Sequence, residues 1–510
     1  MSFKSIKVRC HIVIVLIVLV CYSSSAQNRV FKITDFGAKG DSVTINTMAI
    51  QKAVDSCSIS GGGKVVVPVG KFITGTIVMK SNVELNIARN GCITGSVNFV
   101  DYPLQPLPEY RSHKDQMGGF HAIIYAENAN NIAITGQGKI DGQGYFQKPR
   151  PNPVADDIDG RPRNILFISC NNVTIDGVEL WNSGLWNLHL LNCEQVTVNN
   201  IKVNNHANKN NDGIDIDGCR KVLMSNSTID CDDDGIVLKS TGAAPCEDIV
   251  ITNCIISSYV NAIKAGTESS GGFKNISISN CVIMPSKSKV DPIFNTPRIG
   301  VTGISLMIVD GGTMEGININ NINIHGTKSP IYIRLANRAR KYTKGIKEPP
   351  IGIVKNISLS NIIAYGTGSW GISVTGIAGY PVKNVSFNNI QFFSEGNVEE
   401  GDYNKTVKYD EKAYPMPTEW KNLPAYGLFI RYVENLSVNQ LMLGISAPDV
   451  RVPIMAHHVN GLQITNTILS TPIYDKPFVV GYDLINYKIE KPIGWAGLHS
   501  SDLIKIITQK

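Results

Sequence analysis

The tetrapeptide Asn172-Val173-Thr174-Ile175 begins with a polar residue, which is followed by two apolar residues separated by one variable residue. Copies of this pattern occur at Gln195-Val196-Thr197-Val198, Lys221-Val222-Leu223-Met224, Asp248-Ile249-Val250-Ile251 and Asn275-Ile276-Ser277-Ile278, and again from Gly316, Asn356, Asn384, Asn435 and Gly461. The first apolar residues of the first five copies are 23, 26, 27 and 27 residues apart. Alternation of this kind is typical of a β-strand with one buried face, and a period in the twenties is typical of a parallel β-helix.

The repeat therefore predicts an all-β solenoid that forms one elongated domain over residues 27–510. Leucine-rich repeats share this period, but their leucine-rich consensus is absent from the chain. One helical pattern, at Thr47 to Ser58, suits a cap on the N-terminal end of the solenoid. Longer intervals between the later copies leave room for inserted loops.

The composition describes a globular protein. The chain has 510 residues, of which 43% are hydrophobic and 18% are charged, so it can bury a large core. Lys and Arg number 48 against 42 Asp and Glu, a net charge of +6. Three of the basic side chains lie within residues 1–26, so the remainder carries +3. A charge so close to balance argues against nucleic acid as a partner.

Residues 1–26 have the features of a secretory signal peptide. A basic start precedes the apolar run Ile12–Val20, and Ser24 and Ala26 are the small residues that cleavage after Ala26 requires. We therefore expect a secreted or periplasmic protein with no membrane span in its mature chain. A membrane anchor is the alternative, but an anchor needs about 18 or more apolar residues.

Nine cysteines follow residue 26, and no two of them form a Cys-x-x-Cys pair, which argues against a structural zinc site. Several lie close to the repeat, for example Cys170, Cys193 and Cys219. We expect buried thiols inside the coils, with a disulfide framework as the alternative.

A second pattern combines a variable residue, a small residue and Ile. It occurs at Asp212-Gly213-Ile214, Asp234-Gly235-Ile236, Asn261-Ala262-Ile263, Thr302-Gly303-Ile304 and Trp370-Gly371-Ile372. If each copy opens a strand of the same sheet, the variable residues stack about 4.8 Å apart on one side of the coil. Asp212 and Asp234 then become neighbours, with Asn261 one coil beyond.

The segments Asn210–Gly213 and Asp232–Gly235 bring several carboxylates onto two neighbouring coils. Because like charges repel, at least one of these carboxyls should have a raised pKa. A protonated carboxyl beside an ionised one can supply the general acid and the general base of glycoside hydrolysis. On the residues alone, a calcium site and simple Asp-Gly turns remain alternatives.

At this point the chain resembles glycoside hydrolase family 28, the polygalacturonases and rhamnogalacturonan hydrolases. The resemblance extends from Thr34 to Arg340 and rests on Asn210-Asn211-Asp212-Gly213, Asp233-Asp234, Asp35-Phe36-Gly37-Ala38-Lys39-Gly40-Asp41, Ile140-Asp141-Gly142-Gln143-Gly144, Leu185-Trp186-Asn187-Leu188-His189 and Ile236-Val237-Leu238-Lys239-Ser240. It implies a single-domain, right-handed parallel β-helix of the pectin-lyase-like type that acts on a pectic polysaccharide backbone.

The resemblance also implies hydrolysis with inversion, without a metal or another cofactor. Asp233 would match the general acid, and Asp212 and Asp234 would match the pair that activates water. An inverting acid and base are expected about 6.5–9.5 Å apart. Neighbouring strand residues face opposite sides, so Asp233 and Asp234 share a cleft only if the backbone turns there. Asp232 is expected to be structural.

Two departures from the family pattern bear on the substrate. Asn261 stands where polygalacturonases carry the His of Gly-His-Gly, and Gly303-Ile304-Ser305-Leu306 replaces the Arg-Ile-Lys that grips galacturonate carboxylates. We therefore expect a rhamnogalacturonan-type backbone or another pectic glycoside rather than plain homogalacturonan. The candidate substrate-binding residues are Asn210, Lys239, Asn261, Lys264 and Arg334.

Other expectations concern the surroundings of the cleft. His189 is expected to be structural, and Arg338 to Lys344 to form a solvated loop. A β-helix polysaccharide lyase that uses calcium and a non-catalytic carbohydrate-binding β-helix are the alternative functions. Endo or exo action would depend on whether the loops Leu104–His121 or Gly401–Leu423 wall off one end of the cleft.

Overall fold

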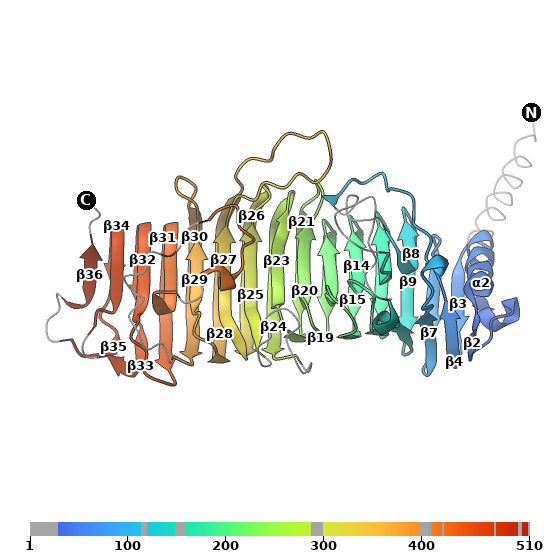
Figure 1. Ribbon diagram of the computed structural model, residues 1–510, viewed down its shortest axis with the longest axis horizontal. Coiled ribbons are helices and arrows are strands. Elements are labelled where there is room, and N and C mark those ends of the chain that lie inside the picture. The colour runs from blue at the N-terminus through green and yellow to red at the C-terminus, as the bar shows by residue number, and fades with distance from the viewer. Residues whose placement is uncertain are drawn as a thin grey trace, which may run out of the picture.

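The molecule is an elongated stack of coils. A computed structural model describes residues 29–113, 120–147, 160–286, 299–396, 407, 410–420, 423–473, 476–497 and 502–507. In this part of the chain, 36 strands pair into one parallel sheet that winds along the long axis (Figure 1). This arrangement confirms the predicted right-handed parallel β-helix. The expected signal peptide, residues 1–26, lies outside the described residues.

In the middle of the chain each strand pairs with the strand three positions later, so three ladders run along the solenoid. We call the ladder that carries the acidic motifs the site sheet. It contains β5 (Ile77–Val78), β8 (Ala122–Glu127), β11 (Arg163–Ile168), β14 (Leu188–Leu191), β17 (Ile214–Asp217), β20 (Ile236–Ser240), β23 (Asn261–Ser269), β25 (Gly300–Ile308), β27 (Thr327–Leu335), β29 (Ile372–Thr375) and β36 (Ile504–Ile507), together with the first parts of β31 (Ala425–Ile445), β32 (Val452–Thr465) and β34 (Val479–Ile489).

The other two ladders complete each coil. The second contains β1 (Val30–Lys32), β3 (Gly63–Val67), β6 (Val83–Ile87), β9 (Asn130–Gly136), β12 (Asn171–Asp176), β15 (Glu194–Asn199), β18 (Arg220–Ser225) and β21 (Cys246–Thr252). The third contains β2 (Asp41–Ile45), β4 (Gly70–Thr74), β7 (Gly91–Gly95), β10 (Lys139–Asp141), β13 (Glu179–Trp181), β16 (Lys202–Asn205), β19 (Thr228–Cys231), β22 (Ile255–Ser258), β33 (Ile468–Ile473) and β35 (Ile493–Trp495). The long strands β24 (Gly272–Met284), β26 (Thr313–His325), β28 (Ile353–Thr367) and β30 (Val382–Ser394) belong to both.

The residue that opens each repeat, polar in most copies and Gly in two, forms a corner of the coil. In all ten copies its φ is positive, from 52° at Asn275 to 79° at Gly461. Gly adopts this left-handed backbone without steric cost, and Asn and Asp tolerate it better than other residues. The amide of Asn172 also donates a hydrogen bond to Asn131 Oδ1 on the preceding coil, at 2.8 Å. The repeat thus encodes a turn followed by an inward-facing strand.

The helix α2 (Thr47–Ile59) covers the N-terminal end of the stack (Figure 1), as predicted. Its residues Ile50, Ala53, Val54 and Cys57 lie on one helical face and are buried against the first coils. Short 3₁₀ turns occur at η1 (Ile33–Phe36), η2 (Phe99–Asp101), η4 (Gly144–Phe146) and η6 (Pro417–Trp420). Among the described residues, no helix combines the length and the apolar character needed to span a membrane.

The thiols are part of the apolar interior. The nine cysteines from Cys57 to Cys281 are free, and all except Cys92 are buried. On neighbouring coils the amide of Cys193 donates to Cys219 Sγ at 3.3 Å. The prediction of buried thiols inside the coils is confirmed.

Candidate active site

Asp212, Asp234 and Asn261 form one column at the start of the site-sheet strands. The amide of Gly213 donates to the carbonyl oxygen of Asp234, and the amide of Gly235 to that of Asn261, each at 2.8 Å. A Cβ at Gly213 would lie 2.6 Å from the carbonyl oxygen of Gly235, which explains the small residue in the pattern. The predicted stacking of these three residues is confirmed.

The column continues through a coil that the sequence pattern skipped. Asn261 aligns with Thr302, as predicted, and Thr302 aligns with Ser329. Sequence inspection missed Ser329 because Pro330 stands where the other coils have Gly or Ala.

Three carboxylates meet where the chain turns between β19 and β20. Asp233 and Asp234 both lie in this turn, so the alternation of strand side chains does not separate them. One oxygen from each of Asp212, Asp233 and Asp234 lies within 4.8 Å of the others. These oxygens are closer than the expected separation of about 6.5–9.5 Å, because Asp233 and Asp234 are consecutive in one turn and Asp212 lies on the adjacent coil.

Asp233 is the most exposed member of this cluster. It is half-buried, whereas Asp212 and Asp234 are each only 2% exposed. Its Oδ1 accepts a hydrogen bond from the amide of Asp234 at 3.0 Å. Burial, and then the negative charges of Asp212 and Asp234, raise the pKa of Asp233 well above its ordinary value. Asp233 can therefore keep a proton at a pH where an ordinary aspartate is ionised.

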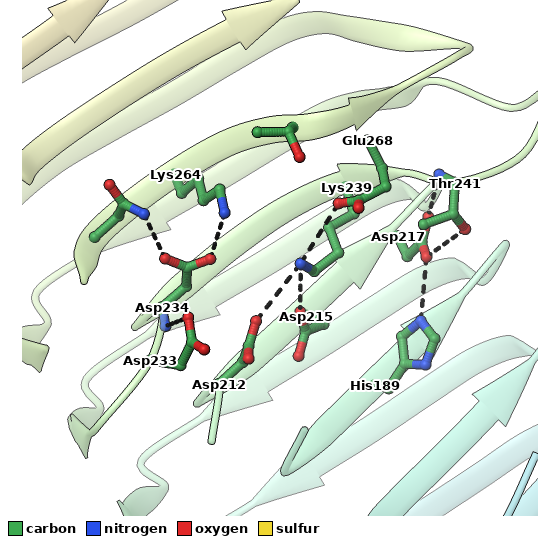
Figure 2. A network of polar contacts seen from close by, with 12 residues as sticks. His189, Asp212, Asp215, Asp217, Asp233, Asp234, Lys239, Thr241, Lys264 and Glu268 are labelled. Atoms are coloured by element: carbon green, nitrogen blue, oxygen red, sulfur yellow. Dashed lines mark hydrogen bonds and ion pairs between the residues drawn. The ribbon is translucent and has the colours of Figure 1, made fainter. Parts of the chain in front are cut away.

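Residues of β23 hold both oxygens of Asp234. Asn261 Nδ2 donates to Asp234 Oδ1 at 2.5 Å. Lys264 Nζ lies 2.5 Å from Oδ2 of the same carboxylate (Figure 2). Thr302 Oγ1 donates to Asn261 Oδ1 at 2.5 Å, which fixes the orientation of the amide. Burial disfavours the charged form of Lys264, but the charge of Asp234 outweighs it and raises the pKa of the lysine. Asn261 thus positions Asp234.

Lys239 connects the acid cluster to further carboxylates. Its Nζ lies 3.5 Å from Asp212 Oδ2 and 3.4 Å from Asp215 Oδ1 (Figure 2). On the far side, Glu268 Oε2 lies 3.8 Å away. Burial opposes the charge of Lys239, yet these carboxylates hold its pKa well above the ordinary value. Its ammonium also lies 4.3 Å from the ring centroid of Trp186.

His189 belongs to a buried structural network, in agreement with its expected role. Its Nε2 lies 3.2 Å from Asp217 Oδ2 (Figure 2). Thr241 donates to Asp217 from its amide at 2.8 Å and from its hydroxyl at 2.6 Å. The ring of His189 packs edge-on against Trp186, with 5.0 Å between the centroids.

His206 joins two acidic residues beside the cluster. Its Nδ1 lies 2.6 Å from Asp232 Oδ1, and its Nε2 lies 3.3 Å from Asp230 Oδ1. Burial lowers the pKa of His206, but the hydrogen bonds to Asp230 and Asp232 outweigh burial and raise it to about 9. Asp232 thus pairs with a protonated imidazole, as suits the structural role expected of it.

Two of the predicted binding residues have partners outside the carboxylate cluster. Asn210 Oδ1 accepts a hydrogen bond from Arg161 Nη2 at 3.2 Å. Arg334 is fully buried, and its guanidinium donates to the carbonyl oxygen of Asp410 at 3.1 Å and to Thr375 Oγ1 at 3.4 Å. The structure does not bring Arg334 to the carboxylates.

Sequence reasoning missed Asp215 and Glu268. Asp215 lies in β17, three residues after Asp212. It alternates with Ile214 and Ile216, which face the interior, and this alternation indicates that the Asp215 side chain faces outward. No spacing rule pointed to Glu268, because it reaches Lys239 from the opposite end of β23.

The basic segment after β27 is also part of this region. Arg338 Nε donates to Asp310 Oδ1 at 2.9 Å, and the Arg338 side chain is largely buried. Arg340 Nη1 lies 3.4 Å from Glu268 Oε1. The expectation that Arg338 to Lys344 form only a solvated loop is wrong at Arg338, because the buried carboxylate of Asp310 pairs with it. The side chain of Arg340 pairs with Glu268 but stays 35% exposed.

Three carboxylates that meet in this way also resemble a cation site. The oxygens of Asp212, Asp233 and Asp234 are close enough to hold a metal ion together. However, the ammonium groups of Lys239 and Lys264 already lie against two of the three carboxylates and offset the negative charge that calcium prefers.

The fold and the site together define a parallel β-helix protein with an acid cluster suited to glycoside chemistry. The family model for glycosyl hydrolases family 28 matches residues 57–410, a range that includes the whole cluster. The chain belongs to glycosyl hydrolases family 28.

Individual relatives match over shorter stretches. A probable polygalacturonase of Vitis vinifera is 29% identical over 275 residues, which are 51% of this chain and 55% of that protein. An exo-poly-alpha-D-galacturonosidase of Dickeya chrysanthemi is 39% identical over 128 residues, 24% of this chain and 21% of that protein. The chain thus spans only part of the length of these curated relatives.

A solved structure matches more of the chain. The hyperthermoactive exopolygalacturonase of Thermotoga maritima superimposes with a TM-score of 0.59 at 24% identity, covering 81% of this chain and 92% of that one. This likeness concerns the fold.

Proposed function

We propose that this protein is a glycoside hydrolase that cleaves the backbone of a pectic polysaccharide. The observation that carries the proposal is the position of Asp233, whose carboxyl lies within 4.8 Å of Asp212 and Asp234 and has a raised pKa. Glycoside hydrolysis needs one carboxyl that donates a proton and a second group that activates water. Membership of family 28 supports the same reaction.

In the proposed reaction Asp233 donates its proton to the glycosidic oxygen as the bond between that oxygen and the anomeric carbon breaks. Asp212 and Asp234 orient a water molecule, which attacks the anomeric carbon from the opposite face and gives one proton to this pair. The leaving sugar departs with a new hydroxyl, and the other fragment keeps the water oxygen. Lys239 and Lys264 offset the charge of the two water-binding carboxylates.

Inversion is supported by the family resemblance and by the partners of Asp234. Both of its oxygens are occupied, by Asn261 and Lys264, which suits a group that orients water better than one that attacks carbon. The short separation of the oxygens is instead closer to the about 5–5.5 Å of retaining enzymes. Proton NMR of the first product tests the point, and a product that retains the anomeric configuration would contradict inversion.

For the substrate we propose a rhamnogalacturonan-type backbone or a related pectic glycoside. Lys239 and Lys264 are each bound to carboxylates of the protein, so neither is a dedicated partner for a galacturonate carboxylate. A panel of rhamnogalacturonan and homogalacturonan oligosaccharides, with reducing-sugar assay and product analysis, tests this choice. Release of reducing sugar from homogalacturonan alone would contradict the proposed substrate but not the proposed hydrolase activity.

The same panel separates hydrolysis from the alternative functions. A polysaccharide lyase would create unsaturated products that absorb ultraviolet light, and a chelator would stop it. A non-catalytic binding protein would bind oligosaccharides without releasing new reducing ends. We expect new reducing ends, no ultraviolet absorption and full activity with chelator present.

We also propose that the protein is exported, on the basis of the leader at residues 1–26. N-terminal sequencing of the protein recovered outside the cytoplasm should begin at Gln27. Recovery of the uncleaved chain in the membrane fraction would favour the anchor instead.

A further inference from the structure

We infer that the site is a pocket that takes one end of a pectic chain, so that the enzyme is exo-acting. This inference rests on the proposed hydrolase function and concerns where along the polysaccharide it cuts. The observation behind it is a cover over the site sheet, formed by residues 410–420, immediately beyond the acid cluster.

Side chains of β27 that point out of the coil are buried. In β27, Ile331 and Ile333 belong to the interior, so Tyr332 and Arg334, which alternate with them, point outward. Both outward side chains are nevertheless 0% exposed. Side chains as large as Tyr332 and Arg334 reach this degree of burial on the outer face when another segment packs on top of them.

The covering segment is identified by its contacts. Trp420, at the end of η6, lies 5.5 Å from the ring of Tyr332 and 5.1 Å from the guanidinium carbon of Arg334. Trp420 also joins Met307 of β25 and Phe429 of β31 in one buried apolar cluster. At the other end of the segment, the carbonyl oxygen of Asp410 accepts a hydrogen bond from Arg334 at 3.1 Å. The cover is therefore packed onto the sheet at both of its ends.

This cover begins next to the acid cluster. Met416 packs against the buried apolar cluster of Tyr259, Val260 and Val301, and Val260 directly precedes Asn261, the residue that holds Asp234. In register, Lys264 aligns with Ser305, and Ser305 with Tyr332. Coils repeat about every 4.8 Å, so the packed wall at Tyr332 stands about 10 Å along the axis from Lys264. A polysaccharide that continued in this direction would have to pass through that wall.

The opposite flank of the site sheet is covered as well. Phe120, Leu166 and Leu191 form a buried apolar cluster on its outer face, and Tyr110 packs against them. His113, which precedes Phe120 in the chain, binds the coil of β20: its amide donates to the carbonyl oxygen of Thr241 at 2.7 Å. The described parts of both loops that the sequence singled out thus contact the site sheet, one on either side of the acid cluster.

The pattern of products tests the inference on the unmodified protein. An exo-acting enzyme releases one short product from the first minutes and lowers the viscosity of the polymer slowly. A ladder of intermediate oligosaccharides with a rapid fall in viscosity would overturn the pocket while confirming hydrolysis.

Binding to the Asp233→Asn variant tests the pocket independently of catalysis. The ligands are one pectic oligosaccharide in three forms: free, and capped with a bulky group at either end. We expect one of the two caps to lower the affinity at least tenfold, since only one end enters the pocket. Equal affinity for all three forms, or no binding of any, would refute the pocket. If a cap lowers the affinity of the variant but the unmodified protein does not hydrolyse the oligosaccharide, the proposed hydrolase function is refuted and the pocket is not.

A variant of the wall gives a third test. Trp420→Ala removes the side chain that packs on Tyr332 and should lengthen the first products. Trp495→Ala removes an equally buried tryptophan of β35, in another ladder, and should leave the product pattern unchanged. An unaltered product length in a folded Trp420→Ala protein, judged by its unfolding transition, would contradict the assignment of the wall.

Discussion

Asn261 and Asp234 are joined across two adjacent coils by a hydrogen bond of 2.5 Å from the amide Nδ2 to the carboxylate Oδ1. Lys264, three residues after Asn261 on the same strand, takes the other oxygen of Asp234. One strand therefore controls the position and the charge environment of a carboxylate on its neighbour. Because the contact lies outside the apolar interior, it can be changed without opening the core.

The first prediction concerns this positioning bond. Asn261→Ala should lower kcat about 10- to 100-fold with little change in KM, since a hydrogen bond to a charged group contributes about 1.5–3 kcal/mol. Asn261→His, which restores the family residue and a donor, should recover part of the loss. Thr302→Val removes only the hydroxyl that orients Asn261 and should cost less. If Asn261→Ala raises KM and leaves kcat unchanged, Asn261 contacts the substrate and does not position Asp234 for catalysis.

The second prediction concerns the proton donor. Asp233→Asn should lower kcat about 100- to 10,000-fold and leave oligosaccharide binding intact. Because the pKa of Asp233 is raised, the native enzyme should stay active above the ordinary range of an aspartate and lose activity as the pH rises through that pKa. The pH profile of the variant should lack this alkaline decline. Normal turnover by the variant would remove the assignment of the acid.

The third prediction concerns the charge of Lys239. Lys239→Met leaves Asp212 and Asp215 buried without their cation, and we expect a loss of about 3–5 kcal/mol in the free energy of unfolding. Lys202→Met breaks the exposed pair with Glu179 and should cost less than about 1 kcal/mol. Urea unfolding of both variants checks the difference. If both variants lose a similar amount of unfolding free energy, the burial of Lys239 does not increase its contribution to stability.

The fourth prediction concerns His206 and pH. The pKa of His206 is raised from 6.5 to about 9 in the folded protein, so its protonation stabilises the fold by about 3 kcal/mol. This contribution is complete below about pH 6.5 and is lost as the pH rises through about 9. His206→Gln should therefore be less stable than the native protein at pH 6, with the gap narrowing toward pH 10. A gap that does not depend on pH would contradict the prediction.

Much of the fold was readable from the sequence because the repeat obeys local rules. The polar residue of each copy, such as Asn172 or Asn275, adopts a left-handed backbone that few residue types accept, and the apolar residues after it face inward. The column of Asp212, Asp234 and Asn261 followed from the same register. The coil at Ser329 was missed, since Pro330 hides the pattern.

The residues around the column were harder to predict. Arg334 has the positive charge expected of a substrate-binding residue. The cover formed by residues 410–420 packs over it, however, and buries its side chain. Glu268 and Arg340 complete the surroundings of Lys239, and they are 72 residues apart in the chain. Neither lies in a recurring pattern, so no periodicity marked them.

By itself, the sequence determined the coil and the meeting of the three carboxylates, because the period of the repeat sets which residues lie on neighbouring coils. Only the tertiary structure decided what lies over the site sheet: the partners of Lys239, the burial of Tyr332, and the wall formed by residues 410–420. The physical reason is that irregular loops build the outer face. Their packing depends on contacts between distant residues and not on a repeated local conformation.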